Sequence, residues 1–384
     1  MNSKWTTARL KDLALINRES YSRSDGWDFV NYLDTGSITK GVIDKITLID
    51  LRHEKLPSRA RRKVAPYDII YSTVRPNQEH YGIIRHPVAN MLVSTGFVTI
   101  TAKEGVDAQY LYYYLSQPQI TTYLHAIAEQ RVSTYPALNV SDLEELPITV
   151  PPLRIQQEIG EMLSCLDAKI DLNDRMNENL EKQAQAIFKS WFVDFEPFRD
   201  GEFVDSIIGS IPKGWKVEKL EDLVNIKYGK DHRSLSDGDI PVYGSGGLIR
   251  YISEAIYTSE SVLIPRKGTL NNVMLVNHPF WSVDTMFYTE INKPNFAKFL
   301  FQLLKRKDLA SMNVGSAVPS MTVALLNQIR FVLPPDEILE QFERVTNPFY
   351  LKIENNRRQN QILAALRDTL LPKLMSGEIE VPVV

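Results

Sequence analysis

Basic, amide and hydroxyl side chains gather in one stretch of the first third of the chain. From Arg52 to Lys63 the sequence holds six Lys or Arg residues and one Glu. This run leads into YDIIYSTVRPNQEHYG, where such side chains surround the end of an apolar strand. Arginine, asparagine and glutamine can bond base edges in pairs, and serine, threonine and lysine suit phosphates. The candidate nucleic-acid contacts here are Arg59, Arg61, Arg62, Lys63, Ser72, Thr73, Arg75, Asn77, Gln78 and Tyr81.

Similar side chains recur at glycine-rich turns of the second half, in IKYGKDHRS, IPVYGSGGLIRY and IPRKGTLNN. Another pair of polar loops, AEQRVSTYPAL and NVGSAVPSMTV, takes matching places in the two halves. A charged run alone can be a solvated face, so the recurrence is what favours binding. The further candidates are Lys230, Arg233, Tyr243, Ser245, Gly246, Arg266, Lys267 and Asn271, with Arg131, Ser133 and Ser316 in the paired loops.

The sequence contains no recognisable catalytic or cofactor pattern. The GSGG that begins at Gly244 lacks the Gly-Lys-Ser/Thr of a phosphate loop and the sixth-position glycine of a dinucleotide fingerprint. The six histidines show no metal-ligand spacing, and no Gly-x-Ser-x-Gly turn occurs. We therefore expect no cofactor, no metal and no catalysis by the chain itself.

Composition narrows the class of protein. The 384 residues suggest two or three domains, and a net charge of -3 excludes a strongly basic coat. Any binding of nucleic acid must then come from local patches. The only cysteine, Cys165, excludes an internal disulfide, and MNSKWTTARLKDL has no apolar core of a secretory signal. No apolar run approaches the ~20 residues of a membrane helix, so we expect a cytoplasmic protein with no membrane partner.

The chain is an internal repeat. VPPLRIQQEI and LPPDEILEQF place their double prolines 183 residues apart. At this offset Pro136 matches Pro319, and the alternating residues of a predicted strand match as well: Leu146, Ile148 and Val150 with Ile329, Phe331 and Leu333. At the front, WTTARLKDL matches WKVEKLEDL at an offset of 210. Two variable domains of unequal length are therefore each followed by a similar segment.

Each segment after a double proline has the pattern of a long helix. Apolar residues and two asparagines recur at alternating spacings of four and three, which is the seam of a heptad coiled coil. The central seam positions are Leu166, Ile170, Asn173, Asn177 and Leu180 in the first helix and Ile353, Asn356, Asn360 and Leu363 in the second. A seam asparagine costs stability but fixes register. The second seam is rougher, because it also contains Thr346 and Arg367.

The two helices are predicted to pair with each other, although each could instead pack on its own domain. An antiparallel pair matches Asn177 with Asn356 and Asn173 with Asn360. It also sets small Ala184 against Phe349 and places Trp191 near Phe342, a complementarity of size that favours it over parallel pairing. Pro348 follows a good N-cap, Asn347, so we expect a break or kink near Thr346. Asp336 is the expected N-cap of the second helix.

The fold class expected is α+β, with two similar domains of mixed α/β structure joined by two long helices in an antiparallel coiled coil with pseudo-two-fold symmetry. The expected boundaries are 1–150 for the first variable domain, 151–195 for the first helix, 196–213 for a linker, 214–333 for the second variable domain, 334–377 for the second helix and 378–384 for a tail.

The assembled features resemble the specificity subunit of type I restriction-modification systems over essentially the whole chain. The resemblance rests on LPITVPPLRIQQEI with IRFVLPPDEILEQF, on FKSWFVDFEPF and IPKGWKVEKLEDL, and on IPVYGSGG and LRDTLLPKLMSGEI, in this order. The tetrapeptides VPPL and LPPD are not the Asn/Asp-Pro-Pro-aromatic signature of adenine methyltransferases.

Family resemblance implies two target recognition domains that each bind half of a split, asymmetric site in double-stranded DNA. It implies that the coiled coil sets the spacing and docks two methyltransferase subunits, that two motor-nuclease subunits can join, and that this subunit is not itself an enzyme. Two alternatives stay open: a coiled-coil scaffold that recruits proteins without reading DNA, and an enzyme whose site is not visible in the sequence.

Overall fold

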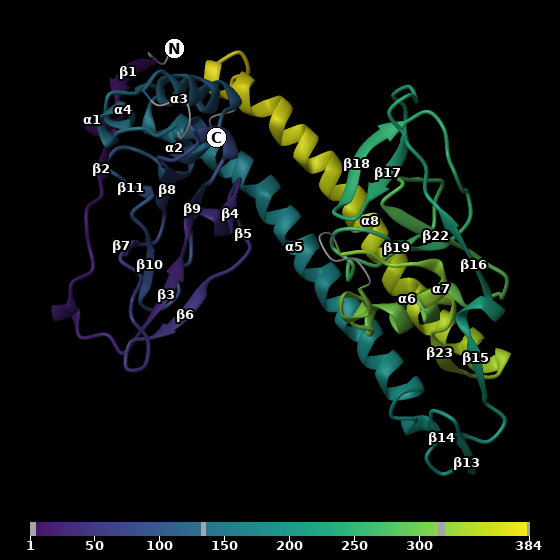
Figure 1. Ribbon diagram of the computed structural model, residues 1–384. Helices are drawn as coiled ribbons and strands as arrows, with labels where there is room; N and C mark the ends of the chain where they lie inside the picture. The colour runs from purple at the N-terminus through teal and green to yellow at the C-terminus, as the bar shows by residue number, and fades with distance from the viewer. Residues whose placement is uncertain (1–4, 132–135, 314–318, 382–384) are drawn as a thin grey trace. The chain divides into compact units, whose positions relative to one another are not determined.

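The computed structural model describes residues 5–131, 136–313 and 319–381 and has the predicted α+β class (Figure 1). The chain forms two compact units. Unit 1 comprises Met1–Leu172 with Gln359–Val384, and unit 2 comprises Asn173–Arg358. The unit boundary therefore falls within each of the two long helices, α5 (Leu153–Phe192) and α8 (Asp336–Ser376).

Unit 1 is built around two four-stranded sheets. The first is antiparallel, in the order β2 (Ala14–Ile16), β11 (Phe97–Ala102), β8 (Asp68–Ser72), β9 (Tyr81–Ile84). The second is mixed, in the order β6 (Thr47–Asp50), β3 (Phe29–Leu33), β10 (Met91–Ser94), β7 (Ala60–Lys63). The remaining elements are β1 (Thr6–Arg9), α1 (Leu10–Leu13), β4 (Ile38–Thr39), β5 (Val42–Ile43), α2 (Ala108–Leu115), α3 (Pro118–Arg131), α4 (Val140–Glu144) and β12 (Pro147–Val150).

Unit 2 has a four-stranded and a three-stranded sheet. The four-stranded sheet has the order β16 (Val224–Tyr228), β22 (Met286–Ile291), β19 (Ser261–Pro265), β20 (Met274–Val276). The three-stranded sheet has the order β18 (Gly247–Ile252), β17 (Ile240–Gly244), β21 (Trp281–Ser282). The other elements are β13 (Phe203–Ser206), β14 (Gly209–Pro212), β15 (Lys216–Lys219), α6 (Ala297–Lys305), α7 (Val323–Asn327) and β23 (Arg330–Leu333).

The first strand of each repeat pairs with the last, and both offsets found in the sequence appear in this pairing. In unit 1 Thr6 of β1 lies opposite Val150 of β12. In unit 2 Lys216 of β15 lies opposite Leu333 of β23. Lys216 follows Thr6 by the front offset of 210 and Leu333 follows Val150 by the back offset of 183. The two repeats are therefore closed by antiparallel pairs in the same register, and β12 and β23 share one burial pattern.

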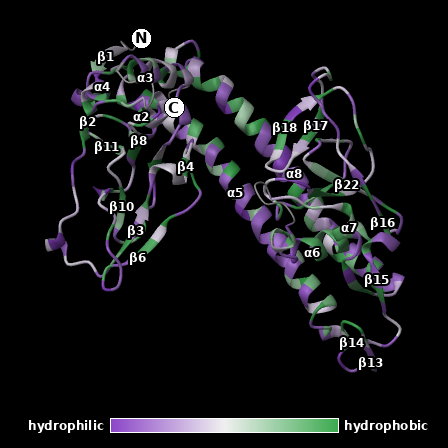
Figure 2. Ribbon diagram, viewed as in Figure 1, coloured by the Kyte–Doolittle hydropathy of each residue, from purple (hydrophilic) through white to green (hydrophobic). Residues whose placement is uncertain are grey.

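The two long helices run antiparallel in each unit. In unit 1 Arg367 of α8 bonds Asp167 of α5, and Asn360 reaches the carbonyl of Ile170. In unit 2 the Nδ2 of Asn356 donates to Oδ1 of Asn177 over 2.8 Å. The rings of Trp191 and Phe342 lie 6.2 Å apart, as predicted. Figure 2 shows polar and apolar residues alternating along both helices, and none of the predicted seam residues is exposed.

Asn173 and Asn360 belong to different units, so their predicted pairing stays a prediction. A break or kink was predicted near Thr346. The break was wrong, because α8 is continuous from Asp336 to Ser376, and the kink stays a prediction. A proline removes one helical hydrogen bond, here the one from residue 348 to the carbonyl of Arg344. Phe342 and Ile353, on either side of Pro348, are both buried in the core cluster, and this packing holds the helix in place. Asp336 was predicted as the N-cap but is the first helical residue.

Candidate nucleic-acid interface

In unit 1 the candidate loop that follows β8 is held in place by three backbone hydrogen bonds. The amide of Thr73 donates to the carbonyl of Gly96 over 2.9 Å, and the amide of Arg75 donates to Pro136 over 2.9 Å. The carbonyl of Thr73 accepts from the amide of Leu138 over 2.8 Å. The loop then turns into a 3-10 helix, Pro76–Gln78. Three segments distant in the sequence therefore meet at the end of β8.

The loop after β19 in unit 2 makes the same three hydrogen bonds. The amide of Arg266 donates to the carbonyl of Thr285 over 2.8 Å, and that of Gly268 donates to Pro319 over 3.2 Å. The carbonyl of Arg266 accepts from Met321 over 2.8 Å. Thr73 and Arg266 therefore take equivalent places, as do Arg75 and Gly268. We call the two assemblies loop cluster 1 (59–61, 73–78, 94–96 and 136–138) and loop cluster 2 (228–233, 244–247, 266–271, 282–285 and 319–321).

Positive φ occurs at the same place in both loops. Arg75 has φ 46° and Gly268 has φ 85°. Glycine tolerates this conformation freely, whereas a residue with a side chain is strained by it. A Cβ atom on Gly268 would also lie 2.9 Å from the Oγ of Ser245, in the tip that joins β17 to β18. Arg75 therefore occupies a backbone position for which the other repeat uses glycine.

Exposed polar side chains surround both loops. The amide of Thr95 donates to the carbonyl of Arg59 over 2.8 Å, which places Arg59 beside the Gly96 turn of loop cluster 1. In loop cluster 2 the amide of Lys230 donates to Ser282 over 2.8 Å, and the Nη1 of Arg266 donates to the carbonyl of Asp284 over 2.9 Å. The exposed members of the predicted set are Arg59, Arg61, Asn77, Gln78, Lys230, Arg233, Gly246, Lys267 and Asn271.

Several predicted contacts are used inside the fold. Ser72 is buried, and its hydroxyl donates to the carbonyl of Val74 over 3.0 Å. Tyr81 is buried in the core with its hydroxyl on the carbonyl of Ser116, and the Thr73 hydroxyl donates to Gly96. Lys63 pairs with Asp25 over 2.7 Å and lies over the ring of Trp27. These residues support loop cluster 1 and do not form its outer surface.

Other predicted residues are partly engaged. Arg62 is half-buried, and burial lowers the pKa of its guanidinium. Arg233 is exposed but is chelated by Asp231, and Asn271 is exposed with its amide between Asp308 and Ala310. Tyr243 is half-buried near His278, and burial raises the pKa of its phenol to about 12. The carbonyl of Ser245 accepts from Asn272 over 2.8 Å. The side chain of Arg131, with Ser133 and Ser316, lies outside the described residues.

Sequence reasoning missed one exposed aromatic residue of loop cluster 2. Tyr228 is 54% exposed at the end of β16. The guanidinium of Arg266 lies 5.4 Å from the centre of its ring. The tyrosine stands two residues before Lys230 in IKYGKDHRS, so its position beside the basic residues was the available signal. A planar ring next to cations suits contact with the sugar and base edges of a nucleic acid.

Comparisons with known proteins now bear on this arrangement. The model of the family described as type I restriction modification DNA specificity domain matches residues 2–182 and 212–364. The chain belongs to this family. It is 30% identical to the type I restriction enzyme MjaIX specificity subunit of Methanocaldococcus jannaschii, over 85% of this chain and 81% of that relative. It is 25% identical over 98% of its length, and all of the relative, to the HindI specificity subunit of Haemophilus influenzae.

The fold is also that of a solved member of this family. The type I restriction-modification S subunit from M. genitalium superposes with a TM-score of 0.60 over 97% of this chain and 96% of that chain, at 17% sequence identity. Within the described part of the chain no group of three acidic, cysteine or histidine side chains could hold a metal ion. No helix in the same residues is long and apolar enough to cross a membrane.

Proposed function

We propose that the chain is the DNA specificity subunit of a type I restriction-modification complex, and that loop clusters 1 and 2 each bind one half of a split target. The observation that carries this proposal is the set of three hydrogen bonds that recurs at the ends of β8 and β19. One scaffold used twice, with different side chains, suits a target whose two halves have different sequences. The family membership supports DNA as the class of ligand, and we infer that this DNA is double-stranded.

Side-chain chemistry indicates which residues of each cluster would contact phosphates and which would contact bases. Arg59, Arg61, Lys230 and Lys267 are exposed cations, suited to phosphates on both sides of a groove. Asn77 and Gln78 are exposed amides at the tip of loop cluster 1, and an amide can bond the N6 and N7 edge of adenine with two hydrogen bonds. We infer that the cations give affinity and that the loop tips give sequence preference.

The long helices are proposed to connect the two half-site readers and to dock two methyltransferase subunits, with motor-nuclease subunits joining the complete complex. The supporting observation is a set of large apolar side chains that the helix pairing leaves exposed. They include Leu172, 53% exposed, Leu351, 48%, Ile362, 61%, and Leu366, 44%. Ile362 and Leu366 are one turn apart on α8, so they share a face. In this proposal the chemistry belongs to the partner subunits.

The test measures sequence-selective methylation. The chain and a methyltransferase partner are expressed together in cells, and the methylome should show one bipartite adenine-methylated site. A gel-shift titration of the same complex against specific and random duplexes should show selective retention. Retention without selectivity would favour the alternative, a coiled-coil scaffold that assembles proteins without reading DNA, and methylation by this chain alone would show that it carries its own catalytic site.

A further inference from the structure

In each unit a short helix of the recognition domain contacts a long helix, α2 on α5 in unit 1 and α6 on α8 in unit 2. The two short helices are equivalent because each follows a six-residue strand, β11 or β22, with the same burial pattern. Tyr113 in α2 and Gln302 in α6 take the same place, and both are buried. The residues that these helices meet can therefore be compared pair by pair.

In unit 1 the contact is made to a carboxylate of α5. The hydroxyl of Tyr113 donates to Oδ2 of Asp167 over 2.6 Å, and Nη1 of Arg367, from α8, donates to Oδ1 over 2.7 Å. Two turns earlier α5 has a glycine. A Cβ on Gly160 would lie 3.1 Å from the Cβ of Gln109 in α2, so the two helices approach closely there. We call this contact between α2 and α5 the junction of unit 1, and the contact between α6 and α8 the junction of unit 2. The junction of unit 1 combines a hydrogen-bonded carboxylate, Asp167, with close packing of the two helices at Gly160.

In unit 2 the same places hold a different set of side chains. At the offset of 183, the place of Gly160 is taken by Glu343 and that of Asp167 by Tyr350. The place of Arg367 is taken by Ala184 of the first helix. The ammonium of Lys298, in α6, contacts Glu343 over 2.7 Å and Glu260 over 2.8 Å. The side chain of Lys298 is 5% exposed. The amide of Gln302 donates to the hydroxyl of Tyr350 over 2.6 Å, and Ala184 is fully buried in the same core cluster.

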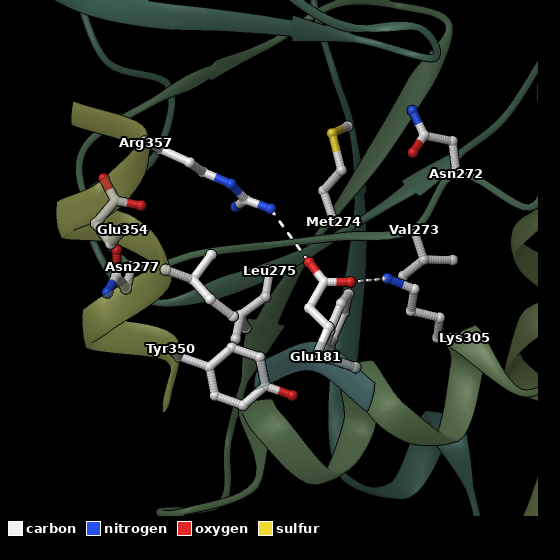
Figure 3. A pocket seen from close by; sticks show the side chains of 12 residues that line it. Glu181, Asn272, Val273, Met274, Leu275, Asn277, Lys305, Tyr350, Glu354 and Arg357 are labelled. Carbon is white, nitrogen blue, oxygen red and sulfur yellow. Dashed lines mark hydrogen bonds and ion pairs between the residues drawn. The ribbon is translucent and has the colours of Figure 1, made fainter. Parts of the chain in front are cut away.

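A third contact strengthens the junction of unit 2. Glu181 of α5 receives Lys305, from the end of α6, over 2.7 Å and Arg357 of α8 over 3.3 Å (Figure 3). The matching residue of the second helix is Ala364, which offers no charge. The acid positions thus differ between the two junctions: residue 167 in unit 1, and residues 181 and 343 in unit 2.

We propose that these junctions are selective docking surfaces, each of which accepts only its own recognition domain. If the second domain docked on α5, Lys298 would face Gly160 and lose Glu343, so that this buried ammonium would keep only Glu260 of its two carboxylates. If the first domain docked on α8, Gln109 would face Glu343, whose charge would lose its cation. Burying an ion without its partner is strongly unfavourable. Tandem repeats are prone to exchange of equivalent parts, and a penalty on the wrong pair is an effective way to prevent it.

The consequence for function rests on the proposed role in DNA binding: fixed docking determines which half-site each domain reads. The junctions themselves can be tested without DNA. Failure of the docking proposal would appear in the stability or the dimer fraction of the isolated chain, whereas failure of the proposed function would appear only in DNA retention.

The first experiment tests whether the side chains of the unit 1 junction depend on one another. It replaces three of them with the residues at the same places in unit 2. Asp167→Tyr removes the acceptor of Tyr113 and Arg367, and we expect a Tm lower by about 5 °C or more. The triple variant Tyr113→Gln/Asp167→Tyr/Arg367→Ala installs the set found in unit 2 and should recover at least half of that loss. The exposed Glu161→Tyr on α5 is the control and should leave the Tm unchanged. A triple variant no more stable than Asp167→Tyr would overturn the proposal.

The second experiment tests exclusivity by making the two junctions alike. Lys298→Gln/Glu343→Gly/Gln302→Tyr/Tyr350→Asp/Ala184→Arg gives unit 2 the side chains of unit 1. After unfolding and dilution to micromolar concentration, this variant should form at least twice the fraction of domain-exchanged dimers that the wild-type chain forms, measured by size exclusion with light scattering. A dimer fraction equal to that of the wild type would show that the junctions do not determine pairing.

Discussion

Loop clusters 1 and 2 share a backbone but not an arrangement of charge. Thr73 and Arg266 are equivalent, as are Val74 and Lys267, and Arg75 and Gly268. The loop of unit 1 therefore has its cation, Arg75, at the third position. The loop of unit 2 has cations at the first two positions, Arg266 and Lys267. The difference teaches that the repeat preserves the hydrogen bonds that position a loop and leaves its side chains free to vary. Contacts to bases cannot be transferred from one cluster to the other by alignment.

The largest contrast is expected from exchanging the third residue of each loop. Gly268→Arg puts a side chain at φ 85° against Ser245 and should lower the free energy of unfolding by about 1–3 kcal/mol. Arg75→Gly relieves the same conformation and should cost less stability than Gly268→Arg, although it removes a cation. Denaturant unfolding of both variants measures the two effects. Equal losses of stability in both would contradict the equivalence of the two positions.

Changes at the tip of loop cluster 1 should act on one half-site only. Asn77→Ala or Gln78→Ala removes an exposed amide and should cost about 1–3 kcal/mol of discrimination between the correct and a wrong base. The half-site read by unit 2 should be unchanged. Methylome sequencing of each variant, with the wild-type complex as reference, reports both halves at once. Relaxation of both halves, or of neither, would argue against base contact by these residues.

Removing exposed cations should weaken binding equally for all sequences. Arg59→Ala/Arg61→Ala in unit 1 and Lys230→Ala/Lys267→Ala in unit 2 should each reduce the slope of log K against log salt by about 2, one for each lost phosphate contact. Asp50→Ala/Arg52→Ala is the matched control, because these two residues neutralise each other and their joint removal leaves the net charge unchanged. An unchanged slope in one double variant would identify that patch as a solvated surface.

The smallest effect is expected at two aspartates that neutralise neighbouring arginines. Asp50 chelates Arg52 in unit 1, and Asp231 chelates Arg233 in unit 2. Asp50→Asn or Asp231→Asn should raise affinity for random DNA by about twofold, because a positive charge is released. A filter-binding titration would detect this, and unchanged affinity in either variant would place that arginine away from DNA.

The same pairs set a pH dependence. The guanidinium of Arg52 lowers the pKa of Asp50 to about 2, and that of Arg233 lowers the pKa of Asp231. A carboxylate with a lowered pKa in the folded state stabilises that state above its ordinary pKa near 3.8 and loses this contribution as pH falls through the lowered value. Both aspartates therefore remain charged at neutral pH, and binding should not change between pH 6 and pH 8 on their account.

Periodicity explains which features could be predicted from the sequence. The alternation through Ile148 and Phe331 gave the closing strands, and the spacing of Asn177 and Asn356 gave a bonded pair inside the helix seam. Both are regular patterns read along one segment. The exposure of individual loop residues was harder to predict, because β8 is buried at all five positions and not on alternate faces. That is why Ser72, proposed as a contact, lies inside the domain.

The junction residues could not be found from local patterns. Asp167 and Arg367 stand 200 positions apart, and Lys298 is one of many charged residues on polar segments. Arg367 did appear in the sequence as an irregularity of the second seam. A charged residue at a position that should be apolar was therefore the one available signal. It could be interpreted only once the structure placed Tyr113 and Arg367 on the same carboxylate, Asp167.

The interleaved division of the chain has a consequence for synthesis on the ribosome. Unit 2 is continuous, Asn173–Arg358, whereas unit 1 needs its own N-terminal part and the last residues of the chain. Leu371, Leu374 and Met375 are buried in the same core cluster as Leu10 and Ile148. The N-terminal domain is thus translated first but completed last. A chain that stops early leaves that core open, so we expect unfinished copies to be recognised and degraded before they can join a complex.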